Sequence, residues 1–91
     1  MNQTKEKLLQ KIKEDLNDLS NTDPVYKKAL RDLNQINAEN SIDPIKAALV
    51  DCYHKLITLE KTGQLTVNET VLLNDIENWK DFIISSNDLN S

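Results

Sequence analysis

The segments "NTDPVYKKAL" (residues 21–30) and "SIDPIKAALV" (residues 41–50) hold the only two prolines of the chain, and an aspartate precedes each proline. An aspartate side chain accepts hydrogen bonds from the free backbone N–H groups at a helix start, and its charge complements the positive end of the helix dipole. Proline suits the first helical position because its missing N–H is not needed there. The two Asp-Pro pairs therefore predict helices that begin at Pro24 and Pro44.

Other residues mark the remaining helix boundaries. Thr66 and Glu69 in "TVNE" have the spacing of a capping box, and Gly63 suits the position just after a helix end. Thr4 is a further N-cap candidate. Together these signals predict four helices near residues 5–19, 24–38, 44–61 and 67–84, followed by a polar tail over 85–91.

Each predicted helix carries apolar residues at three- and four-residue intervals, the spacing of one helical face. These positions are Leu8, Leu9, Ile12, Leu16 and Leu19, then Tyr26, Ala29, Leu30, Leu33 and Ile36, then Ile45, Ala48, Leu49, Cys52, Leu56 and Leu59, and finally Leu72, Leu73, Ile76, Trp79 and Ile83. Such helices need a packing partner, and short connections favour antiparallel neighbours. The sequence predicts one all-α domain over residues 1–91, an antiparallel up-down-up-down four-helix bundle.

Composition and charge limit the functional class. Hydrophobic residues make up 38% and charged residues 29% of the 91 residues, which is typical of a globular domain. The N-terminus has no apolar segment of the secretory type, and the single cysteine suggests a reducing compartment, so we expect a cytoplasmic protein. No apolar run approaches the length of a membrane span, so any membrane contact is expected to be peripheral.

The net charge of −4 arises entirely after Lys61, where five acidic residues face Lys80 alone. Nucleic acid is therefore not expected as a partner, because phosphate binding needs a basic face.

Catalytic and metal-binding patterns are not apparent in the sequence. His54 falls away from the apolar stripe of its helix and is expected to face solvent, whereas Cys52 lies within the stripe as a core thiol. Asp15 and Asp18 are expected on a solvated face, and Arg31 is the only arginine available to hold an anionic substrate. We therefore expect no enzyme activity, no cofactor, no metal and no small-molecule substrate.

A binding surface is expected on the fourth predicted helix, where aromatic and acidic residues gather. The candidate residues are Asp75, Glu77, Trp79, Lys80, Asp81, Phe82 and Ile83. Tryptophan is enriched at binding hot spots, but large aromatic residues also dominate small cores. Both interpretations of Trp79 stay open at this point.

"DPVYKKALRDLNQI" (residues 23–36) and "DPIKAALVDCYHKLITLEKTGQLTVNETVLLNDI" (residues 43–76) together resemble the enterocin A immunity family, whose members protect producers of pediocin-like bacteriocins. The resemblance covers residues 5–84. The matching residues are Asp23, Pro24, Tyr26, Leu30, Leu33, Asp43, Pro44, Leu49, Val50, Tyr53, Leu65, Thr66 and Leu73. Only the placements of Tyr26 and Tyr53 do not also follow from general rules of helix formation.

The resemblance implies a four-helix bundle in the cytosol of a Gram-positive bacterium and immunity to one bacteriocin or a narrow set of them. The expected partners are the membrane components of the mannose phosphotransferase permease with bacteriocin bound, recognised from the cytosolic side. In this family the C-terminal half determines which toxin is countered. A small helical adaptor, or an antidote that binds a soluble protein partner, remains the alternative.

Overall fold

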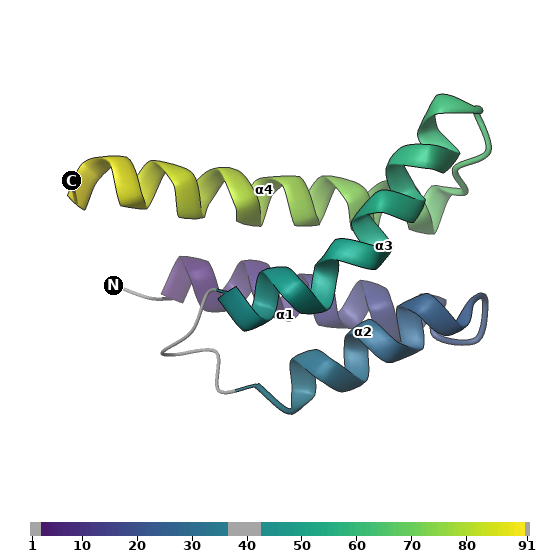
Figure 1. Ribbon diagram of the computed structural model, residues 1–91, viewed down its shortest axis with the longest axis horizontal. Helices are drawn as coiled ribbons and strands as arrows, with labels where there is room; N and C mark the ends of the chain where they lie inside the picture. The colour runs from purple at the N-terminus through teal and green to yellow at the C-terminus, as the bar shows by residue number, and fades with distance from the viewer. Residues whose placement is uncertain (1–2, 37–42, 91) are drawn as a thin grey trace.

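A computed structural model describes residues 3–36 and 43–90, with the side chains of residues 6–36 and 43–83. These residues form four helices and no strand, so the predicted all-α fold is confirmed (Figure 1). The helices are α1 (Gln3–Leu19), α2 (Pro24–Asn34), α3 (Asp43–Lys61) and α4 (Val67–Asn90).

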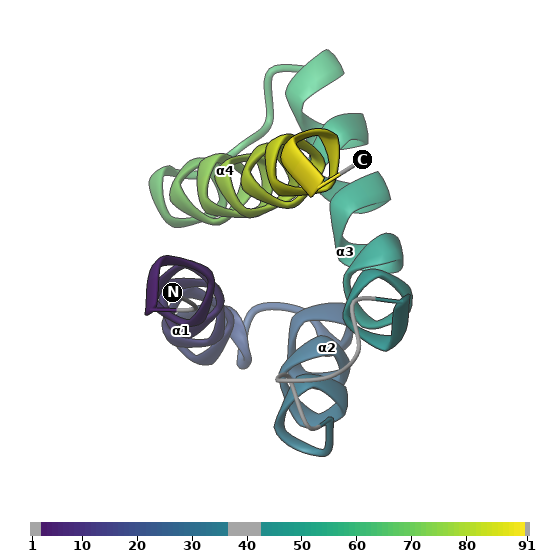
Figure 2. The same cartoon turned by 90° about the vertical axis from the view of Figure 1, so that its left-hand side faces the viewer.

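The four helices contact one another in a ring. α1 packs against α2, α2 against α3, α3 against α4, and α4 returns to α1 (Figure 2). The contact between α1 and α4 is the most extensive, and the contact between α3 and α4 is the least. Figure 1 shows the reason, because α1 and α4 run alongside each other whereas α3 crosses obliquely. The α3–α4 side is therefore the most open part of the packing.

One hydrophobic core joins all four helices. Its buried residues are Leu9, Ile12, Leu16 and Leu19 of α1, Tyr26, Ala29 and Leu33 of α2, Ile45, Leu49, Cys52 and Leu56 of α3, and Leu72, Leu73, Ile76, Trp79 and Ile83 of α4. All of these positions belong to the predicted apolar stripes, and Leu8, Leu30, Ile36 and Ala48 pack at the edge of the core. The core interpretation of Trp79 is confirmed, since only 2% of the residue is exposed.

The predicted cap at the start of α2 is confirmed. The Asp23 side chain accepts a hydrogen bond from the Val25 N–H at 2.9 Å, and Pro24 occupies the first turn. The Lys55 ammonium of α3 lies 3.0 Å from the other Asp23 oxygen. The hydrogen bond from Val25, with the nearby Lys55 charge, holds the pKa of Asp23 below its usual value.

The predicted boundaries between α3 and α4 are also confirmed. Gly63 has φ 70°, and its N–H donates to the Glu60 carbonyl at 3.1 Å while the Gln64 N–H donates to the Leu59 carbonyl at 2.8 Å. These are the two hydrogen bonds of a Schellman motif, which glycine completes without steric penalty.

Thr66 and Glu69 form the predicted capping box at the start of α4. The Glu69 N–H donates to Thr66 Oγ1 at 3.2 Å, and the Thr66 N–H donates to Glu69 Oε1 at 3.1 Å. Each residue thus satisfies a free backbone donor of the other.

Two predicted helix boundaries in the first half of the chain are wrong, the end of α2 and the start of α1. Helix α2 ends at Asn34 and not at residue 38, because the Gln35 and Ile36 N–H groups bond the Asp32 and Leu33 carbonyls in a tighter closing turn. Residues 37 and 38 lie outside the described part of the chain. Thr4 is not an N-cap, since α1 already begins one residue earlier.

The start of α3 and the end of α4 differ from the prediction. α3 begins at Asp43, one residue before the predicted start. α4 does not end at residue 84 but continues to Asn90, so the predicted polar tail is wrong for residues 85–90. The segment contains no glycine or proline that would stop the helix. Ser91 lies outside the described residues.

A buried hydrogen bond connects the starts of α2 and α4. The Tyr26 hydroxyl donates to Glu69 Oε2 at 2.6 Å, and the two residues are 0% and 5% exposed. Burial raises the pKa of Glu69, but the hydrogen bonds from Tyr26 and Thr66 outweigh burial and hold it below its usual value. Glu69 therefore stays ionised, and its two oxygens serve the α4 cap and α2 at the same time.

Replacing Tyr26 with phenylalanine is expected to lower the free energy of unfolding by about 2 kcal/mol, because a buried carboxylate loses one donor. Urea unfolding followed by circular dichroism measures the change. The control is Tyr53→Phe, which removes the hydroxyl of a half-buried tyrosine on α3 and is expected to change stability by less than about 0.5 kcal/mol. Equal losses in the two variants would contradict a special role for the Tyr26 hydroxyl.

Candidate protein-binding surface

The seven residues predicted as a binding surface do not share one face of α4. Asp75, Trp79 and Ile83 follow one another at four-residue intervals and point into the protein, with exposed fractions of 5%, 2% and 4%. Lys80 and Asp81 are exposed, and Glu77 and Phe82 are half-buried. The seven residues therefore do not form one continuous exposed surface, because consecutive helical residues are spread around the axis by about 100° each. Their role in binding stays a prediction.

A groove between α3 and α4, called the α3–α4 groove below, brings three of the predicted residues together. It has a volume of about 280 Å³, and it is lined by Lys46, Leu49, Val50 and Tyr53 of α3 and by Ile76, Trp79, Lys80 and Ile83 of α4. Apolar side chains make up the interior of the groove. It lies where the helix contact is least extensive, which explains why the core is open here.

Sequence analysis missed the α3 side of this groove. Val50 is 43% exposed although it is apolar, and Tyr53 is half-buried beside the core. Both residues lie beside the apolar stripe of α3. An apolar residue in that position is the sequence signal that could have predicted an exposed apolar site here. The α4 residues that they face could not be identified without the packing of the two helices.

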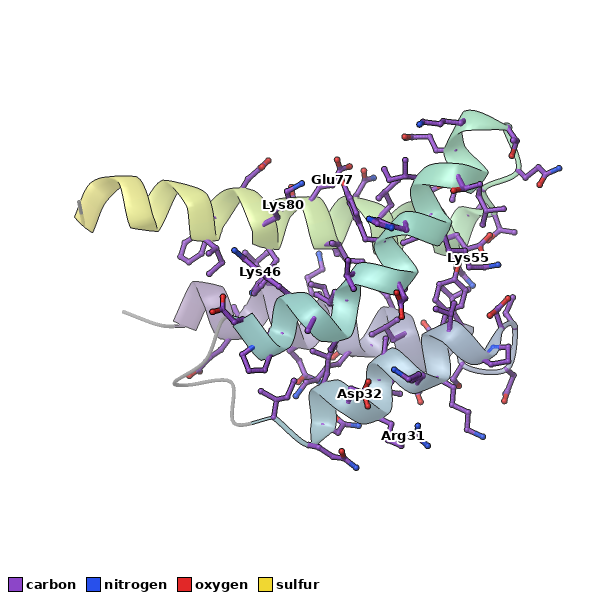
Figure 3. The ribbon with its side chains drawn as sticks, in the orientation of Figure 1. Arg31, Asp32, Lys46, Lys55, Glu77 and Lys80 are labelled. Carbon is purple, nitrogen blue, oxygen red and sulfur yellow. The ribbon has the colours of Figure 1, made fainter. Side chains whose placement is uncertain are left out.

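Two lysines flank the α3–α4 groove. Lys46 of α3 and Lys80 of α4 are both exposed and lie opposite each other on the two helices (Figure 3). The Lys80 ammonium lies 4.9 Å from the centre of the Tyr53 ring, a cation–π contact across the groove. The groove thus combines an apolar interior with a positively charged rim.

A pair of carboxyl groups occupies the interface between α1 and α4. Asp15 is half-buried rather than solvated as predicted, and its carboxyl group lies beside that of Asp75. The Lys11 ammonium lies 3.8 Å from Asp75 Oδ1. Burial, together with the neighbouring carboxyl group of Asp75, raises the pKa of Asp15 to about 7 despite the opposing charge of Lys11. The Asp15 carboxyl group therefore keeps its proton up to about neutral pH.

This pair makes stability depend on pH. Unfolded Asp15 has an ordinary carboxyl pKa, so between about pH 4 and about pH 7 the folded chain binds more protons than the unfolded chain. The contribution of Asp15 to the free energy of unfolding is full at lower pH, falls as the pH rises through this window, and levels off above about pH 7.

Asp15→Asn is expected to remove this dependence, because an amide is uncharged at every pH and does not titrate. Its stability gain over the natural chain should be near zero at about pH 4 and about 1–2 kcal/mol at about pH 8, a reduced value since Asp15 is partly exposed. Urea unfolding across this range measures the difference. Asp81→Asn, which neutralises an exposed carboxylate of α4, is the control. A difference that does not grow with pH would contradict the raised pKa of Asp15.

The other reactive side chains lie apart. Cys52 is buried, and burial raises the pKa of its thiol to about 12, so the thiol stays protonated. His54 is exposed as predicted, and Arg31 is exposed as well. Among the side chains that the structure describes, those of residues 6–36 and 43–83, no cluster of three or more His, Cys, Asp or Glu has the arrangement of a metal site.

Comparisons with known proteins add no relative, since no family model, no curated protein and no solved structure matches the chain. In the described part of the chain, no helix combines the length and the apolar character needed to cross a membrane. Any function inferred for this protein therefore depends on its own residues, on their contacts, and on the sequence resemblance stated above.

Proposed function

We propose that this protein is a bacteriocin immunity protein of the enterocin A immunity type. In this proposal it protects a Gram-positive producer cell from a pediocin-like bacteriocin. It acts in the cytoplasm, where it recognises the membrane components of the mannose phosphotransferase permease once the toxin is bound. The fold proposed for it is an antiparallel up-down-up-down four-helix bundle, which the ring of helix contacts and the short connections support.

The contacts of two tyrosines carry the proposal. Tyr26 and Tyr53 are the matching positions that general rules of helix formation do not require. Each contacts α4, since the Tyr26 hydroxyl binds Glu69 and the Tyr53 ring binds Lys80. Both tyrosines thus connect another helix to α4. This contact gives a structural reason for the two residues to occur together in the matching pattern. This supports the resemblance beyond the shared helix caps.

Immunity of this kind requires recognition and no catalytic group. A binder shifts a permease toward a closed form only by its differential affinity for the toxin-engaged state. Cytosolic loops of membrane proteins are rich in Lys and Arg, so the acidic C-terminal third would complement them. Of the acidic residues predicted for this contact, Asp81 is exposed and Glu77 half-buried, whereas Asp75 is buried beside Asp15.

Expression of the gene in a sensitive strain tests the function. We expect protection against one pediocin-like peptide, or a narrow set, in a panel of such peptides. Growth in the presence of each peptide is the measurement, with immunoblotting to verify that the protein accumulates. Full sensitivity to every peptide in cells that contain the protein would reject the proposal.

The double variant Glu77→Gln/Asp81→Asn tests the acidic contact. We expect about a tenfold loss of protection with helicity unchanged, because both groups reach the surface and charge complementarity favours the encounter. Asp51→Asn/Glu60→Gln removes the same charge from exposed positions of α3 and is the control. Equal protection by the two double variants would rule out a specific role for the acidic residues of α4.

Co-purification from cells with and without bacteriocin separates this function from the alternative. Permease subunits captured only after toxin treatment would support immunity. Capture of one soluble protein regardless of toxin would instead support a helical adaptor or an antidote to an intracellular toxin.

A further inference from the structure

We propose that the α3–α4 groove binds an amphipathic helix of a protein partner, which places apolar side chains in the groove and carboxylates against Lys46 and Lys80. The proposed function assigns no role to this groove and locates recognition in acidic residues. The inference therefore deepens that function, and it rests on it only for the identity of the partner.

The interior of the groove suits apolar side chains. Leu49, Ile76, Trp79 and Ile83 form its buried floor, and Val50 stands at its side with 43% of its surface exposed. Covering this surface would remove apolar area from water, at roughly 25 cal/mol per Å². The groove thus presents apolar surface whose burial by a partner would yield free energy.

The size of the groove favours a helix over a small molecule. Its volume of about 280 Å³ lies just below the range of roughly 300–1,000 Å³ that is typical of pockets enclosing a whole small molecule. A site between two helices that diverge matches helix-in-groove recognition, in which anchors spaced three or four residues apart enter the opening. The occupant would complete the packing where α3 and α4 contact each other least.

The charge of the rim selects an acidic occupant. Lys80 is the only basic residue after Lys61, and it lies at the groove although its surroundings in the sequence are acidic. Its ammonium is held above Tyr53, and Lys46 stands on the opposite helix. Glu77, one turn before Lys80, does not line the groove. Carboxylates of a bound helix would therefore meet two cations at the rim, which fixes orientation and accelerates encounter.

Two synthetic peptides of about four helical turns test the proposal. Both carry leucines at three- and four-residue intervals on an alanine background, and the leucines are flanked by glutamates in one peptide and by lysines in the other. Trp79, the only tryptophan of the chain, lines the groove, so its fluorescence reports occupancy. We expect the glutamate peptide to shift the emission of Trp79 and to bind at least about tenfold more tightly than the lysine peptide.

Charge reversal provides the decisive variant. Lys46→Glu/Lys80→Glu is expected to reverse the preference, so that the lysine peptide becomes the tighter ligand. The control variant Lys27→Glu/Lys61→Glu changes the same net charge at exposed positions that do not line the groove, and it should retain the original preference. Circular dichroism and thermal unfolding of both variants verify that the fold is kept.

Several outcomes would overturn the inference. These are equal binding of both peptides, a preference that charge reversal leaves unchanged, or no response to either peptide. The last includes the case in which the emission of Trp79 shifts only when vesicles of phosphatidylglycerol are added in the same assay. The test is independent of immunity. If the protein protects cells but binds neither peptide, the groove proposal is rejected and the proposed function is kept. If it binds the glutamate peptide but does not protect cells, the proposed function is rejected and the groove proposal is kept.

Discussion

The hydrogen bond between Tyr26 and Glu69 sets the arrangement on which the rest of the structure depends. A buried carboxylate is stable only where hydrogen-bond donors surround it. Glu69 accepts hydrogen bonds from the N–H and hydroxyl of Thr66 and from the hydroxyl of Tyr26 on α2. The ion pair of Lys55 with Asp23 adds α3 to the same corner. The starts of α2 and α4 and the middle of α3 thus meet through polar contacts, beside the core formed by the apolar stripes.

Local signals predicted the parts of the fold that local physics controls. The caps at Asp23, Gly63 and Thr66 involve residues within a few positions of one another, so their spacing alone identifies them. The end of α2 and the length of α4 lack such signals. Without a glycine or proline, a helix ends or continues according to its packing, which no short stretch of sequence contains.

The candidate site was less accessible to prediction, because it depends on which helices face each other. Adjacency in sequence suggested one surface over residues 75–83, yet the helical period turns part of that segment inward. The partners of the inward residues, such as Asp15 for Asp75, lie on another helix. A carboxyl group that appears solvated in the sequence thereby acquires a raised pKa only through tertiary packing.

Opposite charges lie close together on the α3–α4 side of the molecule, and their combination bears on selectivity. Lys46 and Lys80 flank an apolar groove, whereas Glu77 and Asp81 belong to the same part of α4 as Lys80. A partner surface of one charge sign would be attracted by one of these two sets of residues and repelled by the other. A partner state that presents an acidic amphipathic helix beside a basic loop would satisfy both. Because a binder stabilises one state only by its differential affinity, two adjoining surfaces of opposite charge discriminate between partner states better than either surface alone.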